Sequence, residues 1–275
     1  MNKTQILRLM NKKKFKDIPI FIISLKKEKQ RRKEIKNKLE KLSNNYYFFD
    51  AIDGNCVDWS NKREYLGRLR RLFYGKDLTK GELGCFFSHK LLLEKIVAEK
   101  RDMSLVFEDD VILYNDFKNV IEALINKEIT WDFIRFIDKP KLNKKLKLSV
   151  HKLFESYTVT RLGTAPGGAY AYIISQTGAK KLLKAMNKIW TPNDTLMGQT
   201  WRTYSDNLII YPPVASWDKK FESHIGDDRF KKNLLIGWEK KIYPITRAFF
   251  KLIDGILTKL IFYMLYLKNL TTKKT

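Results

Sequence analysis

The order of apolar and charged segments near the N-terminus constrains the fold of this chain most. Residues 18–25, IPIFIISL, form a short apolar run rich in β-branched side chains, which is typical of a strand buried on both faces of a parallel sheet. Residues 26–42 are highly charged but carry apolar side chains at helical spacing, and this pattern predicts a surface helix with one narrow apolar stripe. Residues 46–54, YYFFDAIDG, predict a second strand that ends in an Asp-Gly turn. A strand, a helix and a second strand in this order indicate the start of an α/β sheet of the nucleotide-binding type.

The rest of the chain continues this alternation of strands and helices. Thr79 and Glu82 stand three residues apart at the start of a helical pattern, as in a capping box, so we expect a helix over residues 79–100. Three later segments have strand character and a helical segment follows the last of them; they are residues 104–107, 131–138, 169–174 and 176–186. A chain of 275 residues can hold one large α/β domain with an appended segment.

Three consecutive acids, Glu108, Asp109 and Asp110, stand between two apolar runs in SLVFEDDVIL. Removing carboxylates from water is costly, so a positive partner is expected there. The acids follow the strand at residues 104–107, and in open α/β sheets ligands bind beyond the carboxyl ends of strands. Strand alternation predicts that Glu108 and Asp110 point to one side and Asp109 to the other. Two carboxylates on one side suit Mg²⁺ or Mn²⁺, although an exposed turn with solvated acids is the alternative.

The composition narrows the classes of partner. The 54 Lys and Arg residues exceed the 30 Asp and Glu residues, and the net charge of +24 would attract phosphate, nucleic acid or an anionic membrane. A nucleic-acid-binding protein would interleave basic residues with stacking aromatic residues on one element or show a recognisable binding fold, and this sequence shows neither. Two cysteines are too few for a disulfide framework or a zinc site, which favours a reducing compartment. The N-terminal residues lack the apolar segment of a secretory signal, so we expect a cytoplasmic protein.

Several motifs, in order along the chain, resemble glycosyltransferase family 25, bacterial enzymes that add sugars, often galactose, to lipooligosaccharide. The resemblance extends from about residue 18 to about residue 229. The motifs are IPIFIISLKKEKQRR, FFDAIDG, LTKGELGCFFSHKLLLEKIV, SLVFEDDVIL, GAYAYIISQTGAKKLL and TPNDTLM. Ser24 departs from the family pattern, which has Asn at the end of the first strand, and His224 stands where the family has Asp.

The resemblance implies a fold, a reaction and a cellular location. The fold is of the GT-A type, with a single Rossmann-like α/β domain and a mostly parallel mixed sheet. The reaction is an inverting, metal-dependent transfer of galactose from UDP-galactose, with Mn²⁺ or Mg²⁺ on the acidic motif. The acceptor is a lipid-linked lipooligosaccharide or LPS glycan at the cytoplasmic face of the inner membrane. A non-catalytic protein of the same fold that binds glycan or lipid is the alternative.

The same resemblance assigns roles to individual residues on the donor side. Asp110 is the expected direct metal ligand, supported by Glu108, and His224 is a candidate third ligand unless it is a surface histidine. Six residues are expected to contact the donor together with Glu108; they are Ser24, Arg31, Arg32, Ser88, His89 and Asp109. A buried structural role for His89 and simple solvation of Arg31 and Arg32 are the alternatives.

The acceptor hydroxyl needs a carboxylate to take its proton. Asp194, in the segment TPND at the start of a predicted helix, is the expected general base, although it could be only a helix N-cap. Glu82 and Asp138 are weaker alternatives.

The ends of the chain differ from its middle. We divide the sequence into a basic leader at residues 1–17, a glycosyltransferase domain at residues 18–238, and a basic, apolar helical tail at residues 239–275. Residues 240–268 predict an amphipathic helix with a wide apolar face, which suits a peripheral anchor on an anionic membrane surface. The alternative is a helix that packs on protein. No segment is apolar enough to predict a transmembrane helix.

Overall fold

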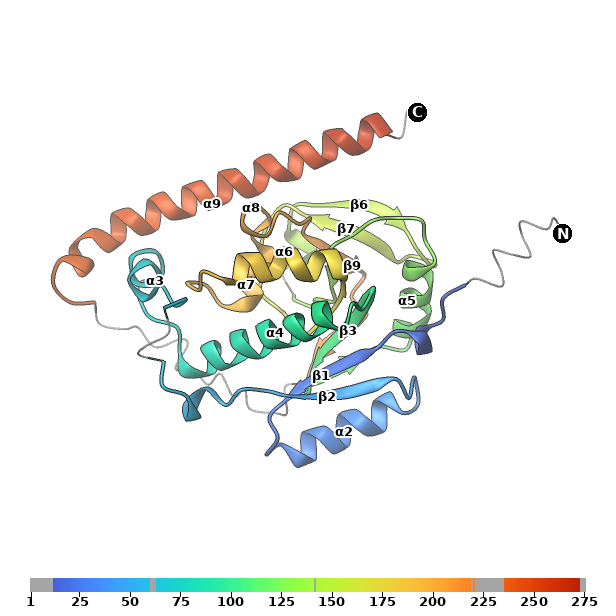
Figure 1. Cartoon of the computed structure of the whole chain (residues 1–275). Helices are drawn as coiled ribbons and strands as arrows, with labels where there is room; N and C mark the ends of the chain where they lie inside the picture. Colours follow the sequence, from blue (N-terminus) through green and yellow to red (C-terminus); the bar gives the residue numbers. More distant parts are fainter. Residues whose placement is uncertain (1–11, 60–62, 141, 219, 221–234, 273–275) are drawn as a thin grey trace.

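A mixed eight-stranded sheet forms the centre of the protein (Figure 1). The computed structural model describes residues 12–59, 63–140, 142–218, 220 and 235–272. The strands in spatial order are β2 (Tyr46–Asp50), β1 (Ile20–Ser24), β3 (Met103–Glu108), β8 (Ala171–Ser175), β5 (Phe133–Arg135), β9 (Leu208–Tyr211), β7 (Thr158–Leu162) and β6 (Lys147–Lys152). Six of them point the same way, and β8 and β7 are reversed. A separate two-stranded ribbon pairs β4 (Val111–Leu113) with β10 (Ala215–Trp217).

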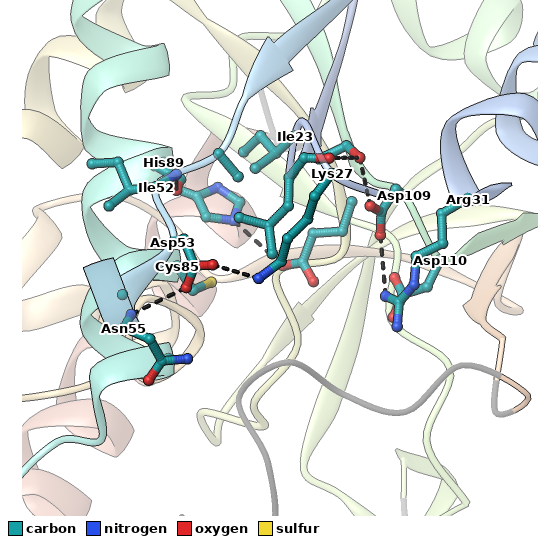
Figure 2. Close-up of a pocket in the computed structure, with 17 residues that line it drawn as sticks. Ile23, Lys27, Arg31, Ile52, Asp53, Asn55, Cys85, His89, Asp109 and Asp110 are labelled. Atoms are coloured by element: carbon teal, nitrogen blue, oxygen red, sulfur yellow. Dashed lines mark hydrogen bonds and ion pairs between the residues drawn. The ribbon is translucent and has the colours of Figure 1, made fainter. Parts of the chain in front are cut away.

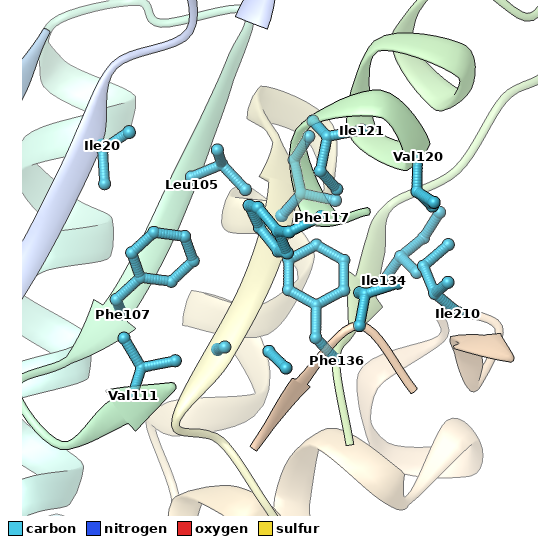
Figure 3. Close-up of a cluster of buried hydrophobic side chains, with 14 of the residues drawn as sticks. Ile20, Leu105, Phe107, Val111, Phe117, Val120, Ile121, Ile134, Phe136 and Ile210 are labelled. Atoms are coloured by element: carbon cyan, nitrogen blue, oxygen red, sulfur yellow. The ribbon is translucent and has the colours of Figure 1, made fainter. Parts of the chain in front are cut away.

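Helices cover both faces of the sheet, because alternate side chains of each strand point to opposite faces. Ile20, Ile22, Leu105 and Phe107 face one helical layer, and Phe21, Ile23 and Val106 face the other. The first layer holds α2 (Lys29–Leu39) and α5 (Phe117–Ile125), and Figure 3 shows its core with α5 packed on the strands. The second layer holds α4 (Lys80–Ala98), α6 (Gln176–Met186) and α7 (Asn193–Gly198). Shorter elements complete the domain; they are α3 (Gly67–Tyr74), α8 (Thr200–Thr203), η1 (Phe15–Asp17), η2 (Gly54–Cys56) and η3 (Leu142–Lys144).

The predicted opening of the fold is confirmed. β1 pairs in parallel with β2 and with β3, and α2 connects β1 to β2. The predicted capping box is present as well, since the Thr79 hydroxyl accepts from the Glu82 backbone N–H at 3.1 Å and the Glu82 carboxylate accepts from the Thr79 backbone N–H at 2.8 Å. The strand predicted over residues 131–138 is shorter than expected and spans only Phe133–Arg135. The hairpin of β6 and β7 extends the sheet beyond the predicted strands.

A long helix, α9 (Gly237–Thr272), lies across one side of the domain (Figure 1). Its first half is fixed to α3, where Arg71 Nε donates to Glu239 Oε2 at 2.8 Å and Phe73 stacks on Phe250 with ring centroids 4.6 Å apart. The face turned away from the domain carries large apolar side chains that are each more than half exposed; they are Ile245, Phe249, Leu252, Ile256, Leu260, Tyr263, Met264 and Leu267. Among the described residues, no helix combines the length and the apolar content that a membrane span needs.

Candidate functional site

A cleft opens at the carboxyl ends of β1 and β3 and beyond the end of β2, at the edge of the sheet where α/β proteins bind ligands (Figure 2). It encloses about 800 Å³ of space, with its open mouth included. Its walls come from the strand ends, from the loop after β2 and from one face of α4. The lining residues that the following paragraphs use are Ser24, Lys27, Arg31, Asp53, Gly54, Cys85, Ser88, His89, Glu108, Asp109 and Asp110.

All three predicted acids line this cleft. The regular strand ends at Glu108, and Asp109 and Asp110 form the turn that leads into β4. The expected alternation therefore stops at Glu108, because a turn does not place side chains on alternate sides as a strand does.

Asp109 is held by residues that the sequence assigned to donor binding. Its Oδ2 accepts from the Ser24 hydroxyl at 2.6 Å, and its Oδ1 faces the Arg31 guanidinium at 3.4 Å. The Asp109 and Arg31 side chains are about nine-tenths buried. Burial raises the pKa of Asp109, and the contacts with Ser24 and Arg31 counteract that shift. Ser24 and Arg31 thus stabilise one ionised carboxylate at the wall of the cleft.

Asp110 differs from Asp109 because one of its carboxylate oxygens has no hydrogen-bond donor among the described residues. Its Oδ1 atom is buried, and no described residue donates a hydrogen bond to it. Burial, together with repulsion from Glu108 and Asp109, raises the pKa of Asp110 to about 7. A buried carboxylate oxygen without a partner is costly, and a hard divalent cation is the ligand that would offset the cost. The residues present therefore fit the Mn²⁺ or Mg²⁺ that the sequence implies, with Asp110 and Glu108 as the oxygen donors.

Glu108 faces α4. His89 is fully buried, and its Nε2 lies 3.3 Å from Glu108 Oε1 while its Nδ1 lies 3.0 Å from the Tyr172 hydroxyl. Cys85 lies one helical turn before His89 on the same face of α4. Burial, assisted by neighbouring acids of which Glu108 is the strongest contributor, raises the pKa of the Cys85 thiol well above its ordinary value.

Two further predicted donor ligands are engaged with the protein itself. The Ser88 hydroxyl donates to the Gly84 carbonyl at 2.7 Å and accepts from the Ile52 backbone N–H at 2.8 Å, so it ties the loop after β2 to α4. Arg32 contacts the Asp50 carboxylate at 2.5 Å and donates to the Ser24 carbonyl at 2.7 Å. Arg32 is not among the residues that line the cleft. A donor contact by either side chain stays a prediction.

Two glycines allow the loop after β2 to approach α4. A Cβ atom on Gly54 would lie 1.8 Å from the Lys80 carbonyl oxygen, and one on Gly84 would lie 2.7 Å from the Ile52 carbonyl oxygen. Both distances are shorter than any ordinary van der Waals contact, so only glycine fits without movement of the backbone.

We expect Gly54→Ala to lower the free energy of unfolding by about 2 to 3 kcal/mol, because the loop must move away from α4. Urea unfolding followed by circular dichroism measures this change. Gly255→Ala is the matched control: apart from its chain neighbours and the adjacent backbone of α9, no described atom lies within 4 Å of its Cβ position, so the substitution should be neutral or stabilise by up to about 1 kcal/mol. Equal losses at the two positions would contradict the packing argument.

Asp194 lies in the first turn of α7 but is not its N-cap, because that position belongs to Pro192. Asp194 Oδ2 accepts from the Gly168 backbone N–H at 3.1 Å, and a Cβ atom on Gly167 would lie 2.4 Å from the same oxygen. Asp194 therefore holds the glycine loop that precedes β8, and it does not line the cleft. Its role as general base stays a prediction.

The remaining candidates are placed as follows. Glu82 belongs to the capping box of α4, and Asp138 accepts from the Tyr114 hydroxyl at 2.6 Å. His224 lies outside the described residues, and its role as a metal ligand stays a prediction.

Sequence reasoning missed an ion pair at the mouth of the cleft. Lys27 reaches across to Asp53, and Nζ lies 2.5 Å from Oδ2 (Figure 2). Asp53 also accepts from the Asn55 backbone N–H at 3.1 Å. The available signal was the position of Asp53 just after β2, because β2 runs parallel to β1 and the two strands end at the same edge of the sheet.

Arg135 was missed as well, and it is among the largest fully buried side chains. Its Nη1 donates to the backbone carbonyls of Pro166, Gly168 and Asp194 at 3.0, 3.3 and 3.2 Å. Its Nη2 donates to Asn207 Oδ1 at 2.7 Å. Burial lowers the pKa of Arg135 to about 10, so the side chain still carries its charge at neutral pH. Arg135 thus joins β5, the glycine loop and α7 into one unit.

Comparison of the sequence with known proteins identifies a family of glycosyltransferases. The sequence model described as "Glycosyltransferase family 25 (LPS biosynthesis protein)" matches residues 17–197. "Procollagen galactosyltransferase 1-A" of Xenopus laevis is 29% identical over 180 residues, which cover 60% of this chain and 28% of the relative. "Glycosyltransferase 25 family member" of Aedes aegypti is 30% identical over 249 residues, which cover 78% of this chain and 40% of the relative. "Inactive glycosyltransferase 25 family member 3" of Homo sapiens is 30% identical over 176 residues, which cover 60% of this chain and 28% of the relative.

The matched region thus accounts for less than half of the length of each of these relatives. Within this chain, the matched region contains β1, β2 and β3, the turn at Asp109 and Asp110, and the face of α4 that carries Cys85 and His89. With its GT-A-like α/β fold, the chain belongs to glycosyltransferase family 25.

Proposed function

We propose that this chain transfers galactose from UDP-galactose, with inversion, onto a lipid-linked oligosaccharide of the LPS type. The observation that carries this proposal is a buried carboxylate oxygen of Asp110 that has no hydrogen-bond partner among the described residues and lies beside Glu108 at the ligand-binding edge of the sheet. Similarity to relatives that are named procollagen galactosyltransferases supports galactose as the sugar. The family description as an LPS biosynthesis protein supports the class of acceptor.

The donor side of the reaction follows from the walls of the cleft. Asp110 and Glu108 would hold a divalent cation, which when bound supplies positive charge to the diphosphate as it leaves. Arg31 and Ser24 favour the ionised form of Asp109 and fix its position, so that it can accept hydrogen bonds from the hydroxyls of ribose or sugar. Lys27 at the mouth places a further cation where a diphosphate would enter.

The acceptor side needs a carboxylate within about 3 Å of the attacking hydroxyl. We propose Asp194 for this role. The Gly168 backbone N–H orients one of its oxygens, and the absence of a side chain at Gly167 lets the loop approach the same oxygen closely. Inversion requires the base to lie on the face of the sugar opposite the leaving diphosphate. Because Asp194 does not line the donor cleft, this role requires the acceptor to bind on the side of the glycine loop.

A screen of nucleotide sugars tests the reaction. With Mn²⁺ present, UDP-galactose should be hydrolysed or transferred faster than the UDP-glucose and GDP-sugar controls, and a chelator should abolish the activity. The human relative named inactive makes non-catalytic binding the second candidate. Saturable binding of UDP-galactose in calorimetry without turnover on any acceptor would establish that second function and contradict the first.

We also propose that α9 lies on the anionic cytoplasmic face of the inner membrane. Its exposed apolar stripe, defined above by its eight residues, spans about six helical turns, and a soluble surface would not ordinarily expose such a stripe. Lys259 is exposed and lies three residues from Ile256 and four from Tyr263, so it borders the stripe. A stripe bordered by lysine suits an anionic lipid surface, where each lysine contributes about 1 kcal/mol of attraction.

A double substitution in the stripe tests this location. Leu252→Glu with Ile256→Glu should lower partitioning onto vesicles that contain phosphatidylglycerol by more than about tenfold, because two apolar side chains that would enter the lipid become charged. Leu91→Glu, at an exposed apolar position on α4, is the control and should partition as the unsubstituted protein does. If the stripe instead joins two copies of the chain, sedimentation without lipid will show a concentration-dependent dimer that the double substitution abolishes, and the membrane proposal fails.

A further inference from the structure

Three potential metal ligands of different chemistry meet at the back of the cleft. Cys85 and His89 are four residues apart on α4 and share one face of the helix. Glu108 approaches this face from the end of β3. The Cys85 sulfur, one ring nitrogen of His89 and one carboxylate oxygen of Glu108 all lie within 4.8 Å of one another.

The histidine is oriented as a metal ligand needs to be. Its ring is fully buried and stacks on Tyr172 with ring centroids 5.8 Å apart. In the tautomer that carries its proton on Nδ1, His89 donates to the Tyr172 oxygen at 3.0 Å and turns the lone pair of Nε2 toward Glu108. A second partner that fixes the tautomer and the ring angle is a regular feature of metal-binding histidines.

The mixture of ligands selects the kind of ion. Sulfur and imidazole nitrogen favour Zn²⁺ or Co²⁺ over Mg²⁺, which prefers oxygen throughout. Zinc bonds of about 2.0 to 2.3 Å place tetrahedral ligand atoms roughly 3.3 to 3.8 Å apart, so the three side chains need to approach one another by only about 1 Å. The cleft is open on the remaining side, where water could complete the coordination.

We propose that Cys85, His89 and Glu108 form a binding site for a thiophilic divalent cation such as Zn²⁺, distinct from the oxygen site at Asp110. Glu108 belongs to both sets, so an ion at the thiol site withdraws this carboxylate from the oxygen site. Zn²⁺ bound there therefore inhibits the sugar transfer proposed above. This consequence rests on the proposed function, whereas the binding itself does not.

Cobalt is the probe for binding, because a cobalt–thiolate bond absorbs in the near ultraviolet through charge transfer. Titration of the full chain with Co²⁺ should produce this absorption at one equivalent, as the thiol releases its proton to solvent, and Zn²⁺ should remove it. Cys85→Ser and Cys85→Ala should both lose the absorption. His89→Gln should weaken Co²⁺ binding by more than about tenfold.

Cys56→Ser is the matched control, since Cys56 is free, exposed and outside the cluster. It should keep the absorption unchanged. Persistence of the absorption in both Cys85 variants, its loss in the Cys56 variant, or its absence from the unsubstituted protein would overturn the site. Circular dichroism of each variant separates loss of binding from loss of the fold.

Inhibition is the second readout. At fixed Mn²⁺ and UDP-galactose, Zn²⁺ should reduce transfer by the unsubstituted protein, and Cys85→Ser should raise the inhibitory Zn²⁺ concentration by more than about tenfold relative to Cys56→Ser. Charge-transfer absorption in a protein without transferase activity would support the thiol site and contradict the proposed function. Inhibition that is equal in the two variants would overturn the link between the two sites.

Discussion

Asp110→Asn is expected to lower kcat/KM for UDP-galactose by about a thousandfold at saturating Mn²⁺. Asparagine keeps the shape of the side chain but removes the charge that the proposed cation needs, so the leaving diphosphate would lose its stabilisation. Initial rates of galactose transfer or UDP release measure the effect. Asp102→Asn, at an exposed acid just before β3, is the control and should leave kcat/KM unchanged.

The same substitution has a second, opposite effect that shows whether the fold is intact. The pKa of Asp110 rises from its ordinary value of 3.8 to about 7 in the folded protein, so the folded state holds this proton more tightly than the unfolded state does. Without a divalent ion, the free energy of unfolding should therefore fall as the pH rises between about 4 and 7.

Asp110→Asn removes this dependence and should increase the free energy of unfolding at pH 8 by on the order of 1 to 3 kcal/mol. Urea unfolding at pH 5 and pH 8 in the presence of a chelator measures both values. A variant that is inactive and also less stable than the unsubstituted protein at pH 8 would contradict the assignment, because its loss of activity would then reflect loss of structure.

Arg135→Ala is expected to lower the free energy of unfolding by about 4 kcal/mol and the Tm by about 10 °C. Three backbone carbonyls and Asn207 would lose their donor inside the protein, and the truncated side chain would leave a cavity. Urea unfolding monitored by tryptophan fluorescence measures the loss, which is a large part of the total stability of a typical domain.

Two comparisons make the Arg135 prediction specific. Arg101→Ala removes an exposed arginine that is paired with Glu99 and should cost less than about 1 kcal/mol. Arg135→Lys keeps the charge but has fewer donors in a fixed plane, so its loss should lie between those of the two alanine variants. Equal stability of Arg135→Ala and Arg101→Ala would show that the four hydrogen bonds of Arg135 do not stabilise the fold, and it would contradict the prediction.

The local elements of the fold could be predicted from sequence because their signals are local. The β-branched run of β1 and the capping box of α4 each lie within a few residues, and both appear where expected. The reversed direction of β8 depends on contacts with β3, about 70 residues earlier in the chain, and strand propensity does not specify direction. The β6 and β7 hairpin carries a weaker pattern because neither strand is apolar along its full length.

The site could be predicted only where residues are adjacent in sequence or share a motif. The acidic turn lines the cleft as the position of Glu108 to Asp110 indicated. The contact of Ser24 with Asp109 joins residues 85 positions apart, and the four acceptors around Arg135 come from three different segments. A charged residue inside the strand WDFIRFID has no local feature that reveals its partners, because those partners are mostly backbone carbonyls.

The segment that leads into β8 contacts both halves of the proposed reaction centre. The Tyr170 carbonyl accepts from the Glu108 backbone N–H at 2.8 Å, and two residues earlier Gly168 donates to Asp194. Displacing residues 168–170 would disturb the proposed metal coordination and the proposed proton abstraction together. A change in this segment would therefore affect the use of donor and acceptor at the same time. A substitution that alters only one of the two functions would therefore be expected outside residues 168–170.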